Sequence, residues 1–178
     1  IRRQIEFMKE CQKRIKNILA ICWGMQVAVT AAGGVVNRGK NGAHRGIAHE
    51  IVINSDGLNH PIYKDKDKIF NTPAFNYDEV VTLPKDAILL SSNKVNNVMA
   101  LNFETEFSKI WGIQYHPEIT YEKMITLIKF RRERLLENKS FSDEKDLESH
   151  ISMIENEDKI TKKESRMREL KNWLDLIA

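Results

Sequence analysis

Cys22 has the sequence surroundings of a nucleophile at a strand-to-helix turn. It stands in Ala20-Ile21-Cys22-Trp23-Gly24, with small residues two positions before it and two positions after it. This is the nucleophile-elbow pattern, with Ala in place of the first Gly. The small residues indicate a turn so tight that larger side chains would collide with the neighbouring strand and helix. The following helix favours a thiolate over a thiol. The alternative is a buried structural cysteine, the commoner role of a lone cysteine.

A second reactive group lies far downstream, in Trp111-Gly-Ile-Gln-Tyr-His116-Pro-Glu118. The pattern predicts a strand that delivers His116 at its end, followed by a proline that stops further pairing. A cysteine nucleophile needs a base to take its proton and return it to a leaving amine, and the base needs a carboxylate to orient it. We therefore expect Cys22, His116 and Glu118 to form a catalytic triad that the fold brings together.

The other histidines give a much weaker signal. His44, His49 and His60 could be imagined as a metal cluster, but their spacing fits no standard ligand frame and no cysteine joins them. The sequence therefore predicts neither a metal nor a cofactor. A short basic patch that follows the last core helix is expected to be solvated rather than to bind nucleic acid.

The elements that must position the reactive residues follow one another in the order typical of an α/β protein. Apolar residues at helical spacing predict a helix over 1–15, in which Cys11 is expected to be buried as a small apolar residue. The nearly unbroken apolar run at 17–21 is typical of a strand in a parallel sheet, buried on both faces. A second helix is expected to end at Gly33, and residues 35–46 to form a loop. Further strands are expected at 49–54, 87–92, 97–103 and 109–115, the middle two antiparallel around a turn.

Composition limits the classes of protein. The chain has 178 residues, of which 42% are hydrophobic and 30% charged, with a net charge of +3. These values suit one globular domain and exclude a disordered, collagen-like or rod-like chain. The net charge is too small to indicate nucleic acid, and no apolar stretch is long enough for a membrane span. Two cysteines make no disulfide framework, so a cytoplasmic location is expected.

The C-terminal part differs in composition. Between residues 121 and 178, 26 of 58 residues are charged, while apolar residues keep helical spacing. The pattern favours packed helices with solvated faces, and a helical tail that docks on a partner is the alternative. We expect a first domain over residues 1–130 and a helical extension over residues 131–178.

With both motifs in view, the sequence resembles the class I, or triad, glutamine amidotransferases. ILAICWGMQ is similar to their nucleophile motif, and WGIQYHPE to their His-Pro-Glu motif. The stretch FNYDEVVTLPKDAILLSSNKVNNVMAL is similar to the glutaminase domain of GMP synthetase and its stand-alone relatives. The resemblance covers roughly residues 1–130. Together with the element order, it implies a flavodoxin-like three-layer sandwich with a mostly parallel central sheet, plus the charged helical C-terminal extension.

The resemblance also implies site roles. Cys22 matches the nucleophile, His116 the general base and acid, and Glu118 the carboxylate that orients it. The Trp23 N–H matches one oxyanion donor, and Gln26 matches a residue that helps hold the substrate. The backbone at Asn76 and Tyr77 matches the loop that receives the substrate's amino-acid head group. Because the family often has His where Tyr77 stands, only the backbone contacts carry over there.

The sequence departs from the family pattern at its start. Relatives have two strands and a glycine-bearing oxyanion loop before the helix with which this chain opens, and these residues supply no second oxyanion donor. We expect either a fragment of a longer protein or a decayed relative. Loss of one donor costs about 10²–10³ in rate, so these residues alone are expected to be a poor glutaminase.

The function that this sequence predicts is a glutaminase that hydrolyses glutamine through a Cys22 thioester and delivers ammonia to a synthetase domain or separate synthetase chain. No nucleic-acid or membrane partner is expected. Two alternatives stay open. One is a γ-glutamyl peptide hydrolase on the same scaffold, a group that Ala43-His44-Arg45 faintly resembles. The other is a non-catalytic remnant that acts as an interaction subunit.

Overall fold

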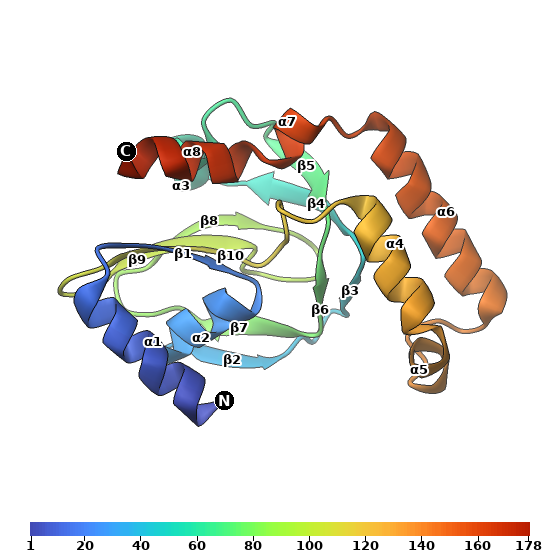
Figure 1. Cartoon of the computed structure of the whole chain (residues 1–178), viewed down its shortest axis with the longest axis horizontal. Helices are drawn as coiled ribbons and strands as arrows, with labels where there is room; N and C mark the ends of the chain where they lie inside the picture. The colour runs from blue at the N-terminus through green and yellow to red at the C-terminus, as the bar shows by residue number, and fades with distance from the viewer.

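The computed structural model describes residues 1–178, and a six-stranded sheet lies at its centre (Figure 1). The strand order in this sheet is β1-β10-β9-β8-β4-β5, and the pairs β2–β7 and β3–β6 lie outside it. The strands are β1 (Asn17–Ile21), β2 (Val35–Arg38), β3 (His44–Arg45), β4 (Ala48–Ile53), β5 (Ile69–Thr72), β6 (Phe75–Asn76), β7 (Asp78–Thr82), β8 (Ile88–Ser92), β9 (Ala100–Glu104) and β10 (Lys109–Ile113).

Strand direction corrects the sequence prediction of a mostly parallel sheet. Only β1 and β10 run parallel, and every other neighbouring pair in the sheet is antiparallel. A parallel pair needs a connection of a dozen or more residues, whereas short turns join β8 to β9 and β9 to β10. The predicted antiparallel pairing of β8 with β9 is confirmed. Because β1 lies at the sheet edge, it is mostly half-buried rather than buried on both faces.

Helices cover both faces of the sheet. In Figure 1, α1 and α2 lie below the sheet, and α3 and α8 lie above it. The α8 side chain Trp173 meets Trp111 of β10 edge-on, with ring centroids 6.5 Å apart. No helix is both long and apolar enough to cross a membrane. The helices are α1 (Arg2–Arg14), α2 (Trp23–Ala31), α3 (Ser55–Leu58), the 3-10 turn η1 (Pro61–Tyr63), α4 (Tyr121–Phe130), α5 (Arg132–Glu137), α6 (Glu144–Ile160), α7 (Lys163–Arg166) and α8 (Arg168–Ile177).

Helices α4, α5 and α6 build a core of their own beside the sheet. Ile128 of α4 and Leu147, Ile151 and Ile154 of α6 are buried together. The charged residues of α6 therefore lie on the outer face of a helix whose inner face is apolar. The chain then returns through α7 and α8 to the sheet, where α8 packs on η1.

Two further sequence predictions need correction. The segment 35–46, predicted to be a loop, contains β2 and β3. Cys11 is half-buried rather than buried, because α1 packs on α2 instead of on the sheet. The buried side chain of α1 is Gln12, whose Nε2 donates to Ala28 O at 3.1 Å.

Close packing of α2 on β10 generates a stability prediction. A Cβ on Gly112 of β10 would lie 2.6 Å from Met25 Cγ and 3.2 Å from Leu101 Cδ1. Overpacking of this kind costs about 1–3 kcal/mol, so urea unfolding of Gly112→Ala should show that loss in the free energy of unfolding. Gly24→Ala is the matched control, because a Cβ there meets no atom within 4 Å. An equal loss in both variants would contradict the packing argument.

Candidate active site

The structure places Cys22 at the turn between β1 and α2. Its backbone has φ 50° and ψ −108°, a conformation that costs a non-glycine residue about 1–3 kcal/mol. The Cys22 N–H donates to Ile113 O at 2.7 Å, and the Gln26 N–H donates to Cys22 O at 3.1 Å, so bonds on both sides hold the strained turn. The predicted reason for the small residue at Gly24 is wrong, since a Cβ there would meet no atom within 4 Å.

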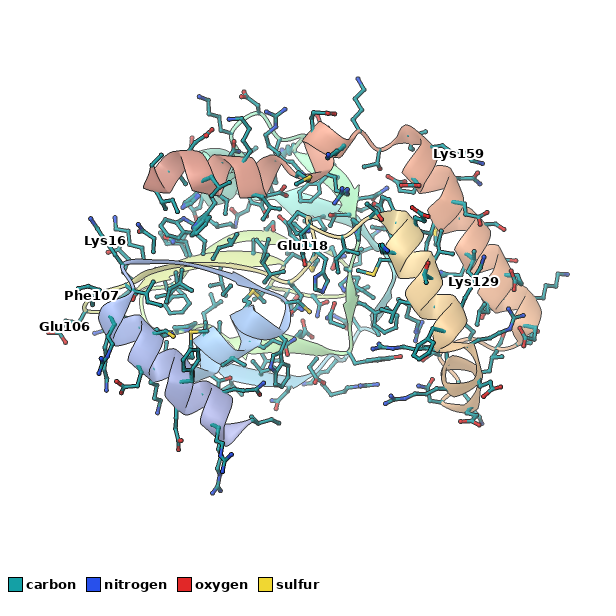
Figure 2. All side chains as sticks on the ribbon, in the orientation of Figure 1. Lys16, Glu106, Phe107, Glu118, Lys129 and Lys159 are labelled. Carbon is teal, nitrogen blue, oxygen red and sulfur yellow. The ribbon has the colours of Figure 1, made fainter.

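His116 and Glu118 follow the end of β10, the strand that pairs with β1. Their side chains meet, with 2.6 Å between His116 Nδ1 and Glu118 Oε1. The His116 N–H donates to Pro73 O at 2.8 Å, which fixes the backbone at this point. Figure 2 shows Glu118 near the middle of the molecule, between the sheet and the C-terminal helices.

The charge on His116 depends on both of its reactive neighbours. Burial lowers the pKa of His116, but its interactions with the Cys22 sulfur and with the Glu118 carboxylate outweigh burial and raise the pKa to about 9. His116 is therefore protonated at neutral pH. The three residues expected from the sequence lie together.

Trp23, the residue expected to supply an oxyanion donor, is the first residue of α2. No helical carbonyl lies one turn upstream of it, so its N–H points out of the helix N-terminus beside Cys22. The indole side chain is 44% exposed. The backbone N–H of Trp23 is thus free of a helical partner beside the nucleophile.

Gln26, expected to hold substrate, has its amide hydrogens bonded within the protein. Its Nε2 donates to Asp78 O at 3.0 Å and to Gln114 Oε1 at 3.1 Å. The fully buried Gln114 in turn donates from Nε2 to Cys22 Sγ at 3.4 Å. Sequence analysis missed Gln114. The available signal was its position two residues before His116, because alternate residues of an extended chain face the same side.

The side chain of Asn76 is also bonded internally. Its Oδ1 meets Nδ1 of the buried His44 at 2.7 Å, and its Nδ2 donates to Asp78 O and Asn96 Oδ1 at 3.0 and 3.1 Å. Burial lowers the pKa of His44, so its ring is neutral and Nε2 can accept from Asn93 at 3.0 Å. No three His, Cys, Asp or Glu side chains gather in a way that could hold a metal ion.

The backbone around Tyr77 lies close to the nucleophile. Phe75 O is 4.0 Å from Cys22 Sγ, so β6 borders the sulfur. The Tyr77 hydroxyl bonds Ser140 Oγ at 3.1 Å, and the Arg38 guanidinium lies 4.4 Å from the centre of its ring. The Tyr77 side chain is thus engaged within the protein, and a substrate contact from the main chain at Asn76 and Tyr77 stays a prediction.

Comparison with known proteins finds a matching family model and two kinds of relative, an amide hydrolase and subunits of GMP synthase. The family model "Glutamine amidotransferase class-I" matches residues 1–132. A gamma-glutamyl-L-1-hydroxyisopropylamide hydrolase from Pseudomonas sp. is 29% identical over 99% of this chain and 66% of its own. A glutamine-hydrolysing GMP synthase subunit from Methanosarcina acetivorans is 32% identical over 60% of this chain and 52% of its own. The chain thus spans about half to two thirds of the length of these relatives.

Solved structures show the same fold. A glutamine amidotransferase from Thermotoga maritima superposes with a TM-score of 0.73 at 20% identity, over 99% of this chain and 68% of its own. A protein from Thermoplasma acidophilum described as a GMP synthase subunit superposes with a TM-score of 0.58 at 20% identity, over 74% of this chain and 67% of its own. On the match over residues 1–132, the chain belongs to the class I glutamine amidotransferase family.

Proposed function

We propose that this protein hydrolyses the side-chain amide of glutamine through a thioester on Cys22 and passes the ammonia to a synthetase partner. The observation that carries the proposal is the meeting of a strained, elbow-borne cysteine with a His116–Glu118 pair held at 2.6 Å. The synthetase partner is inferred from the relatives described as glutamine-hydrolysing subunits of GMP synthase.

The chemistry follows from the charges in the site. A protonated His116 beside the sulfur favours the thiolate, which attacks the amide carbon. The oxyanion that forms would be stabilised by the Trp23 N–H and the N-terminus of α2. His116 then gives its proton to the departing nitrogen, the carbon–nitrogen bond breaks, and ammonia leaves. Water, deprotonated by His116, cleaves the thioester to release glutamate and restore the thiolate–imidazolium pair.

Substrate binding would use few side chains. Both amide hydrogens of Gln26 are engaged, so we assign it the carbonyl oxygen Oε1 as its contact to the substrate ammonium group. The main chain at residues 75–77, which borders the sulfur, would receive the rest of the head group. Gln26 then has a second role, because its Nε2 holds the Gln114 amide that donates to Cys22.

A γ-glutamyl amide hydrolase is the second candidate, and one observation favours it. The Pseudomonas hydrolase aligns over 99% of this chain, C-terminal helices included, whereas the GMP synthase subunits align over 58–66%. The same thioester chemistry would serve, with an alkylamine leaving in place of ammonia. Measuring ammonia and amine release from glutamine and from a γ-glutamyl alkylamide, with and without a synthetase, distinguishes the two candidates.

Covalent labelling tests the nucleophile without requiring turnover. A glutamine-analogue electrophile should modify Cys22 alone, as read by peptide mass spectrometry, because only this cysteine has a proton-transfer partner. Cys22→Ala should abolish labelling and Cys11→Ala should leave it intact. An adduct on Cys11, or on neither cysteine, would refute the assignment and favour the non-catalytic alternative.

The His116–Glu118 pair predicts a pH dependence of stability. The pKa of His116 is raised to about 9 in the folded protein from an ordinary 6.5, so its stabilising contribution is complete below pH 6.5 and is lost as the pH rises to 9. Glu118→Gln removes the carboxylate and should shrink the difference in unfolding free energy between pH 6 and pH 9.5, measured with urea. Glu106→Gln, on an exposed turn far from the site (Figure 2), is the control and should leave that difference unchanged.

A further inference from the structure

The segment that carries His116 and Glu118 is bonded to the C-terminal helices. Arg166, the last residue of α7, is buried, with 7% of its surface exposed. Its Nη1 donates to Pro117 O and, at 2.9 Å, to Ile119 O. Pro117 O belongs to the peptide group that leads into Glu118, and Ile119 O lies one peptide group beyond Glu118, so one guanidinium bridges the backbone on the two sides of the carboxylate-bearing residue.

A second contact from α8 reaches the residue before His116. The Tyr115 hydroxyl donates to Glu169 Oε1 at 2.8 Å, and both side chains are fully buried. Glu169 is itself held by Lys66, with 3.1 Å between Nζ and the carboxylate. Lys66 also donates to Ser165 O at 2.7 Å, which ties the junction of α7 and α8 to the same group.

A charged side chain, Arg166, makes the buried contact between α7 and the turn that carries Glu118. A buried charge costs several kcal/mol unless it is well bonded, and apolar residues of similar volume pack a helix at less cost. Arg166 donates its charged hydrogen bonds to Pro117 O and Ile119 O, two backbone carbonyls of the turn that carries Glu118. Apolar packing would attach α7 as firmly but would not fix the orientation of those peptide groups.

We propose that Arg166 and Glu169 are positioning residues that hold Tyr115–Ile119 in the conformation in which Glu118 orients His116. The proposal rests on the proposed function for the catalytic meaning of that pair. Both residues lie outside the part of the chain that the family model matches, residues 1–132. Two residues that set the conformation of the His116–Glu118 segment would therefore lie in the charged C-terminal helices.

Three variants of the full chain test this role. Arg166→Met keeps an unbranched apolar side chain but removes both hydrogen bonds to the turn, and Arg166→Lys keeps one donor nitrogen. Tyr115→Phe removes only the hydroxyl group that donates to Glu169. Lys163→Met is the matched control, because it removes one positive charge from an exposed position on α7.

The quantity to measure is the pKa of His116, and an NMR titration of its ring protons gives it. Cys22 and Glu118 are the two groups that raise the pKa of His116, and loosening the turn moves Glu118 away from it. Arg166→Met should lower the pKa of His116 from about 9 toward 6.5. Arg166→Lys and Tyr115→Phe should lower it by less, and Lys163→Met not at all. In an active preparation, kcat of Arg166→Met should fall about 10–100-fold with little change in KM.

The outcomes separate this proposal from the proposed function. If folded Arg166→Met keeps the wild-type His116 titration, the positioning role is refuted, whatever the protein hydrolyses. If Arg166→Met does not fold, an unchanged titration in both Arg166→Lys and Tyr115→Phe refutes it equally. A lowered pKa in these variants supports the positioning role even if Cys22 fails to form a thioester, because the titration requires no substrate.

Discussion

The parallel pairing of β1 with β10 is the constraint on which the site depends. Ile21 lies opposite Ile113, and the Cys22 N–H continues the ladder to Ile113 O at 2.7 Å. Because the two strands run in the same direction, the residues that follow them emerge at the same edge of the sheet. In an antiparallel pair, Cys22 and His116 would lie at opposite ends of strands about 15 Å long. One pairing in an otherwise antiparallel sheet thus sets the distance between nucleophile and base.

Around this pairing, buried polar groups fix the direction of each reactive side chain. The positive φ of Cys22 is held by two backbone hydrogen bonds, and its sulfur accepts a third from Gln114. The side-chain amides of Gln26 and Asn76 also bond within the protein, Gln26 through Nε2 to Gln114 and Asn76 through Oδ1 to His44. Networks of this kind are stable only when their members are satisfied together, so they favour one arrangement of the site over others.

The features that the sequence predicts are those encoded by a few consecutive residues. The apolar run of β1, the small residues around Cys22 and the His-Pro-Glu turn each have a local pattern, and all three lie where expected. Strand direction depends on which distant segments pair, so a mostly parallel sheet was wrongly predicted. The contact of Gln114 with Cys22 likewise joins residues far apart in the sequence, so no local pattern predicts it. Arg166 could not be found because it stands in a stretch whose high charge indicates solvated helix faces, whereas its side chain, like that of Glu169, is buried.

The Lys66–Glu169 pair has a consequence for how the molecule comes apart. Their side chains are 1% and 0% exposed, so lifting α8 from η1 would leave an ammonium and a carboxylate without their partners. Lifting α8 would also part Trp173 from Trp111 of β10 and Glu169 from the Tyr115 hydroxyl, so apolar and polar contacts together join α8 to the sheet. We therefore expect α8 to separate from the sheet only when the sheet itself unfolds. Heat or denaturant should produce one cooperative transition, and backbone amides of α8 should exchange with solvent as slowly as those of β10.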